Sequence, residues 1–212
     1  MRTLPHLEMS YCTNVHPGEG IESLMKLIES DLPKIKAEVS AHQPFGSGLR
    51  LGAQSVYALS DNPQAILDIS QAMRDRDLYV FSVNGFPYGD FAAPSVKERV
   101  YEPDWSSEER VRYTLSLARL MTQLPGPQMK TISTVAGGFV PSLADQTGRD
   151  DEYRRRFSEL SIGLFELEEE TGVSIRVALE PEPWTRLESV AQVIPFFEEV
   201  VWPSSPHAHK YI

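Results

Sequence analysis

Residues 151–180 read DEYRRRFSELSIGLFELEEETGVSIRVALE and contain the clearest change of pattern in the chain. In the first part, apolar side chains recur every three or four residues, which is the spacing of one buried helical face. This pattern predicts a helix over Asp151–Thr171 that stops at Gly172, a residue suited to the position after a helix. The following SIRVALE alternates in character and predicts a strand over Ser174–Glu180.

Strand and helix patterns alternate in the same way along the rest of the chain. Further strands are predicted at 7–15, 48–51, 78–84 and 129–135. A helix is expected after each strand: from Ile21, with a break or kink at Pro33; from Asn62-Pro63; from Ser106 to Leu124; and, after the last strand, over 187–201. Ser106 and Glu109 have the spacing of a capping box.

Repetition of strand and helix five times favours a parallel sheet with right-handed crossovers. Two architectures fit: an incomplete (β/α)8 TIM barrel with about five β/α units, or an open five-stranded doubly wound parallel sheet. The strand starts lie about 41 residues apart, so eight units need roughly 330 residues, and the chain has 212. The incomplete, truncated barrel is the preferred interpretation, and it assigns residues 1–201 to one partial barrel.

The last eleven residues, 202–212, read WPSSPHAHKYI and break the pattern. They contain two prolines and two serines, and their apolar residues have no helical or strand period. We therefore expect a non-native-looking or disordered tail at this end.

Composition excludes several classes of protein. The net charge is −10, which argues against nucleic acid as a partner because phosphate binding needs a basic surface. No apolar run reaches the roughly 20 residues of a membrane span, and MRTLPHLEMS does not resemble a leader peptide. Cys12 is the only cysteine, so an intrachain disulfide is impossible and a cytoplasmic location is expected.

The strongest candidate for a chemical role is Glu180. Alternation along the strand places it on the same face as Arg176 and Ala178, opposite the more apolar face. In a barrel that face points inward, and active sites lie at the carboxyl ends of the strands. Glu180 and Glu182 are therefore candidate catalytic carboxylates, and Glu180 is a candidate divalent-metal ligand. The alternative is a structural ion pair between Glu180 and Arg176.

Polar residues also follow the first and third strands. Asn14 and His16, in TNVHPGEG, and Asn84, in VNGFPYG, are candidate substrate-binding residues at the same mouth. Phe86 and Tyr88 suit the wall of a pocket for a small polyol-like ligand. The alternatives are a structural histidine and ordinary turn chemistry at Asn84-Gly85.

Loop residues add weaker candidates. Glu98, Arg99 and Tyr101 lie in the long segment 85–105 and could close over a ligand. Gly137-Gly138, after the fourth strand, could cradle a phosphate. Dinucleotide-binding, Walker and HExxH motifs are absent from the sequence.

Five segments together resemble one family: YCTNVHPGE (11–19), QPFGSGLRL (43–51), VFSVNGFPYG (80–89), STVAGGF (133–139) and ALEPEP (178–183). They are similar to the metabolite-traffic protein EboE family of the xylose-isomerase-like TIM-barrel superfamily, over Leu7–Val201. The resemblance implies the processing or export of a biosynthetic precursor, with ancestry in metal-dependent sugar isomerases and epimerases. The alternative is a non-catalytic module that binds or carries a small metabolite.

The resemblance also implies a role for Glu180 as a ligand of a divalent metal such as Mn, Mg or Zn. The superfamily's other ligands, an aspartate, a histidine and a second glutamate, come from later strands that this sequence does not contain. Whether the chain is an enzyme therefore stays open. The implied partners are a small-molecule metabolite, other proteins of the ebo cluster, and any chain that associates with the open barrel edges.

Overall fold

The computed structural model describes residues 2–4, 7–88, 100–140 and 149–212. Its main sheet contains six strands, and all of its paired strands are parallel. The strands are β3 (Ser10–Cys12), β4 (Phe45–Arg50), β5 (Leu78–Tyr79), β6 (Ser82–Asn84), β7 (Met129–Val135) and β8 (Ser174–Glu180). The predicted strands at 129–135 and 174–180 are confirmed to the residue.

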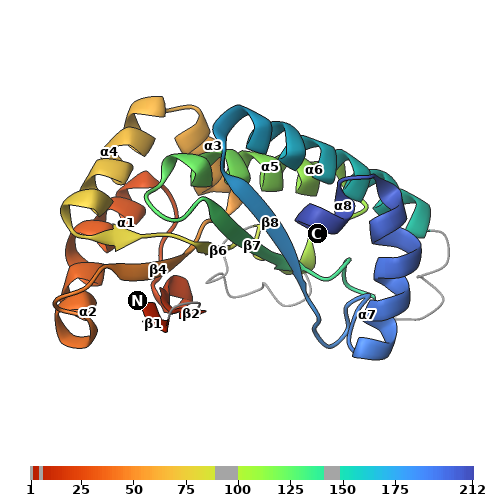
Figure 1. The fold of residues 1–212 in the computed structure, drawn as a ribbon, viewed down its shortest axis with the longest axis horizontal. Coiled ribbons are helices and arrows are strands. Elements are labelled where there is room, and N and C mark those ends of the chain that lie inside the picture. Colours follow the sequence, from red (N-terminus) through yellow and green to blue (C-terminus); the bar gives the residue numbers. More distant parts are fainter. Residues whose placement is uncertain (1, 5–6, 89–99, 141–148) are drawn as a thin grey trace.

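The order of the strands identifies the architecture. They lie in the order β3-β4-β6-β7-β8, and β5 pairs with β4 beside β6. This order follows the sequence without the reversal that defines a doubly wound sheet. The fold is therefore the α/β arrangement of an incomplete TIM barrel, and the open doubly wound alternative is wrong. In Figure 1 the helices α3, α4, α5 and α6 lie along one side of the curved sheet.

Three predicted strands differ from those observed. The strand expected at 48–51 is β4, which begins three residues earlier and ends one residue earlier. The expected strand 7–15 is divided: β2 (Leu7–Glu8) pairs antiparallel with β1 (Arg2–Leu4), and β3 is followed by a 3-10 turn, η1 (Thr13–Val15). The expected strand 78–84 is interrupted between β5 and β6. The interruption has a clear cause, because the amide of Val80 donates to the carbonyl of Pro125 instead of to a neighbouring strand.

The first helical region confirms the expected break at Pro33. It consists of α1 (Ile21–Lys26), a π-helical turn η2 (Leu27–Asp31) and α2 (Leu32–Val39). Proline has no amide hydrogen and collides with the carbonyl four residues earlier, so the turn before it widens. The next helix, α3 (Ala53–Ser60), was not predicted; α4 (Pro63–Asp75) begins as expected, with the Asn62 side chain accepting from the amide of Ala65.

The remaining helices are α5 (Glu108–Gln123), α6 (Asp150–Thr171), α7 (Val190–Phe196), its π-helical extension η5 (Phe197–Val201), η6 (Trp202–Ser204) and α8 (Ala208–Tyr211). The capping box predicted for Ser106 and Glu109 is wrong. Ser107 is the N-cap of α5, and the Ser106 hydroxyl donates to Asp104. The Glu109 carboxylate is instead bonded by the hydroxyl of Tyr88.

Residues 202–212 differ from the irregular tail expected from the sequence. Ala208 and Tyr211 of α8 are fully buried, and the Ser205 hydroxyl is hydrogen-bonded to that of Ser161 on α6 at 2.7 Å. Lys210 also forms an ion pair of 2.8 Å with Glu168. The segment packs through spaced individual side chains and not through a periodic stripe.

The two faces of the sheet have different character. Val83, Ile132 and Val177, which are paired across β6, β7 and β8, are at most 4% exposed and face the helices. The neighbouring row, Asn84, Ser133 and Ala178, lies on the opposite face and is partly or fully exposed. The face away from the helices is therefore polar and open at its β8 end, and we call it the concave face.

The helix-facing side of β7 also contains a buried cation. Lys130 is 2% exposed, and its ammonium group donates to the carbonyls of Met121 and Leu124 at 2.7 Å, at the end of α5. Burial lowers the pKa of Lys130 to about 8. The ammonium group thus supplies a strong donor to two carbonyls at the end of the helix, where the helix provides few donors of its own.

Lys130→Met is expected to remove a pH dependence of stability. Because the folded pKa is near 8 and the unfolded value near 10.4, the unfolded chain binds more protons between these pH values. Stability should therefore rise with pH, by about 2 kcal/mol between about pH 7.5 and 9.5. Urea unfolding of both proteins at these pH values checks this, and an equal rise in the variant would contradict it.

In the described parts of the chain, none of the helices combines the length and apolar character that crossing a bilayer requires.

Candidate functional site

Glu180 and Glu182 lie at the carboxyl end of β8. Glu180 is paired with Val135 of β7 and is exposed on the concave face. Glu182 follows Pro181, and its amide donates to the carbonyl of Leu187 at 3.0 Å. Within the part of the chain that the structure describes, Glu180 forms no ion pair with Arg176, because the two are four positions apart on one strand, about 13 Å.

Glu182 lies near a loop from a different part of the sheet. Burial and the nearby Glu182 carboxylate raise the pKa of Tyr101, in the segment between β6 and α5, to about 12, so its hydroxyl is neutral at pH 7. Because β7 lies between β6 and β8, this proximity connects loops two strands apart, at the edge where barrel sites lie.

Tyr101 belongs to a cluster of three aromatic rings, Phe86, Tyr101 and Phe139, which we call the aromatic cluster. The Tyr101 ring stacks on Phe139 with centroids 5.5 Å apart and meets Phe86 edge-on at 5.6 Å. Phe139 follows β7 and forms an isolated bridge with Thr185. The cluster therefore brings together the segments after β6, β7 and β8. The sequence indicated Phe86 but not Phe139, since periodicity says nothing of loop contacts.

Trp184 stands beside this cluster in an unusual backbone conformation. Glu182 accepts from the amide of Thr185, and Pro183 and Trp184 are the central residues of the turn. Trp184 has a φ of 68°, a value that glycine usually adopts at the second central position of a turn. Its side chain is 63% exposed. A large aromatic residue kept exposed at such a position is a candidate contact residue.

Asn84, the last residue of β6, makes a turn contact. Its side-chain oxygen accepts from the amide of Phe86 at 2.9 Å. The same turn is held by Arg110 of α5, which is fully buried and donates to the carbonyls of Gly85, Phe86 and Pro103. Arg110 was not among the predicted residues, although its spacing from the buried residues of α5 places a charge on the core side of that helix.

The residues predicted after the first strand form a separate group. His16 lies beside a cavity of about 140 Å³, with its Nε2 3.0 Å from the Tyr11 hydroxyl and its Nδ1 3.9 Å from Asp31. Asn14 is exposed in η1. Since β3 and β8 are the first and last strands in the order of the sheet, the structure does not pair these residues with Glu180.

Gly137 and Gly138 allow close packing in the loop after β7. A Cβ atom on Gly138 would lie 2.3 Å from an oxygen of Asp104, and one on Gly137 would lie 2.5 Å from the Arg186 side chain. Asp104 is buried and pairs with Arg149 at 2.9 Å. A carboxylate against Gly138 opposes the binding of a phosphate there, so this loop does not suit the proposed cradle.

The donor groups of the described residues do not form a divalent-metal centre. Among the described residues, no three His, Cys, Asp or Glu side chains come close enough to hold a metal ion. A stable site for such a cation needs several oxygen or nitrogen ligands, and Glu180 alone supplies one group. Glu98 and Arg99 lie outside the described residues.

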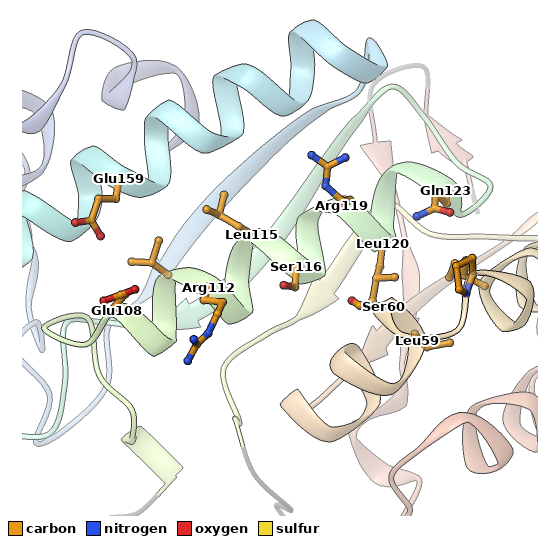
Figure 2. Close-up of a pocket in the computed structure, with 13 residues that line it drawn as sticks. Leu59, Ser60, Glu108, Arg112, Leu115, Ser116, Arg119, Leu120, Gln123 and Glu159 are labelled. Atoms are coloured by element: carbon orange, nitrogen blue, oxygen red, sulfur yellow. The ribbon is translucent and has the colours of Figure 1, made fainter.

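A larger hollow lies on the helical side of the molecule. A groove of about 570 Å³ runs between α3, α4 and α5, with an apolar floor that includes Leu59 and Leu120. Figure 2 shows Arg112 and Arg119 on α5 at its rim, and Arg119 is bonded to Glu170 at 2.8 Å. The groove contains none of the predicted site residues.

No family model and no curated protein matches this sequence. Among solved structures, a xylose isomerase domain protein from Alicyclobacillus acidocaldarius is 15% identical, with a TM-score of 0.53, over 94% of this chain and 61% of that one. E. coli 3-keto-D-glucoside 4-epimerase is 15% identical, with a TM-score of 0.49, over 90% of this chain and 63% of that one. This chain thus spans less than two thirds of either protein. The first match shows a xylose-isomerase-like TIM-barrel fold. None of these matches supports membership of the EboE family.

Proposed function

We propose that this chain binds a small polyhydroxylated or hydroxy-carbonyl metabolite at the carboxyl ends of its parallel strands. The observation that carries the proposal is the aromatic cluster at that edge, in which Tyr101 stacks on Phe139, Phe139 bridges to Thr185, and the Glu182 carboxylate lies near Tyr101. It combines a carboxylate, a neutral hydroxyl and aromatic faces, which is the mixture typical of small-molecule sites. The role in metabolite traffic that the EboE resemblance implies is part of the same proposal.

Each group has a distinct part in binding. The carboxylates of Glu180 and Glu182 accept hydrogen bonds from ligand hydroxyls, and such charge-assisted bonds are stronger than neutral ones. The aromatic cluster and Trp184 offer faces against which the C–H surface of a sugar-like ring can pack. Their loops leave from β6, β7 and β8, so the rigid sheet fixes the spacing of the contacts.

The donor groups favour a carrier over an isomerase. Metal-assisted isomerisation needs a complete ligand shell, and the described residues supply no cluster of three ligands. Hydrogen bonding and stacking need only the groups already assembled at the mouth. We therefore propose that the chain binds and hands on its metabolite without a metal-assisted step.

The test is calorimetric titration with D-xylose, D-xylulose and myo-inositol. We expect at least one probe to bind, and Glu182→Gln to weaken it about 10-fold or more, since a hydrogen bond to a charged group contributes about 1.5–3 kcal/mol. Tyr101→Phe should also weaken binding. Glu166→Gln, at an exposed position on α6, is the matched control and should bind like the original chain.

Two results would contradict this proposal. One is the absence of binding by all three probes, or equal binding by Glu182→Gln. The other concerns the metal: tighter binding with Mn²⁺, removed by Glu180→Ala, would replace the carrier with a metal-dependent protein.

A further inference from the structure

The cavity beside His16 lies at the carboxyl ends of β3 and β4 and is separate from the aromatic cluster. Its volume is about 140 Å³, and its walls come from η1, the segment 16–20, α1, η2, the end of β4 and the start of α3. An engineered apolar cavity of about 150 Å³ accepts benzene, so this cavity has room for a ligand of about four to six heavy atoms.

One wall of the cavity is a buried guanidinium group. The Arg50 side chain is 6% exposed, and it donates to the Glu19 carboxylate and to the carbonyl of Gly18. The amide of Arg50 donates to the Thr13 hydroxyl at 3.0 Å, which fixes the residue at the end of β4. A guanidinium has five N–H donors, so three remain without an acceptor among the described residues.

Further donors line the same cavity. The ammonium group of Lys26 on α1 forms no ion pair with a described residue, and the hydroxyl of Ser23, three positions earlier, forms no hydrogen bond with one. Among the described lining residues, Asp31 supplies the single carboxylate, and it lies 3.9 Å from the Nδ1 of His16. Donors therefore outnumber acceptors, and the cavity suits a ligand that accepts hydrogen bonds.

The charges at the cavity favour an anion with a single charge. Two cations, Arg50 and Lys26, belong to its lining. Two carboxylates lie there as well, Asp31 in the lining and Glu19 bonded to Arg50. A phosphate dianion would bring two negative charges close to these carboxylates, whereas a carboxylate ligand brings one. The ligand is therefore expected to be a monoanion.

We propose that this cavity binds a short monocarboxylate of about two to four carbons, such as propionate. The carboxylate oxygens accept charge-assisted hydrogen bonds from Arg50 and Lys26, and a further bond from Ser23. The hydrocarbon part packs against three apolar residues of the lining: Leu24, Leu27 and Leu51. The inference is independent of the proposed metabolite site, because the two sites share no residue and take different probes.

The test is a two-dimensional NMR titration of the ¹⁵N-labelled 212-residue chain with propionate at constant ionic strength. The amide resonances of Gly18 and Gly20, which line the cavity, should shift to saturation with a dissociation constant below about 10 mM. Lys26→Glu should raise this constant about 10-fold or more, because a like charge then faces the ligand. Asp31→Asn should lower it about 3-fold, because it removes a like charge, and a purely structural role of Asp31 would not tighten binding.

Two kinds of control separate the cavity from general charge effects. Lys34→Glu, at an exposed position on α2 outside the cavity, makes the same change of net charge and should bind propionate like the original chain. Propionamide, which has a similar size and no charge, and phosphate should each bind about 10-fold more weakly or less. The spectra also show whether each variant is folded. Absence of a saturable shift at the two glycines, equal binding of propionamide or phosphate, or equal effects of Lys26→Glu and Lys34→Glu would each overturn the proposal.

Discussion

Arg110→Met is expected to lower the free energy of unfolding by about 4 kcal/mol. The Arg110 side chain is fully buried and donates to the carbonyls of Gly85, Phe86 and Pro103 at 2.7–3.1 Å. Methionine fills a similar volume but donates nothing, so three carbonyls lose their partner, and each unsatisfied buried group costs about 1–3 kcal/mol. Relief of the buried charge offsets part of this loss.

Thermal unfolding of both proteins measures the effect, and a loss of about 10 °C is expected for a chain of this size. Arg112→Met, two positions along the same helix but exposed, should change the midpoint by little. Equal effects of the two substitutions would show that Arg110 does not hold the loops between β6 and α5.

Gly138→Ala is expected to lower the free energy of unfolding by about 3 kcal/mol, the upper part of the range for overpacked sites. The new methyl group would lie 2.3 Å from an Asp104 oxygen and 2.6 Å from its Cβ. Asp104 cannot move freely, because it accepts from the amide and hydroxyl of Ser106 and pairs with Arg149.

Gly172→Ala is the matched control for Gly138→Ala. Gly172 has open space around its Cβ position and a φ of 71°, so alanine there meets only the cost of the left-handed conformation, about 1 kcal/mol. Urea unfolding compares the two variants. A loss for Gly138→Ala no greater than that for Gly172→Ala would mean that Asp104 is not fixed.

The sequence predicted the elements with strong local patterns. α6, β7 and β8 have long apolar periods and clear stops, and the expected bounds agree with the structure to within one residue. α3 has only eight residues, and two residues separate it from β4. Its apolar residues are therefore too few to form a helical period that stands apart from the strand pattern. The tail was misjudged because Ala208 and Tyr211 bury themselves through tertiary contacts that no local period reveals.

The candidate site was predictable only along the strands. Alternation placed Glu180 on the concave face, since a strand fixes the direction of every second side chain. The proximity of Tyr101 to Glu182 and its stacking on Phe139 join segments that are 81 and 38 positions apart, and they depend on how the loops close. The functional roles of Glu180, Glu182, His16, Asn14 and Asn84 remain predictions.

The most direct test of the proposed site is the fluorescence of Trp184 during titration with a probe that binds in the calorimeter. Trp105 is fully buried, so in a Trp202→Phe background Trp184 is the exposed reporter. We predict that the emission of Trp184 shifts to shorter wavelength, with the same titration midpoint as in the calorimeter. Glu182→Gln should weaken binding to the same extent in both measurements. Calorimetric binding with unchanged Trp184 emission would place the ligand elsewhere and contradict the assignment of the site.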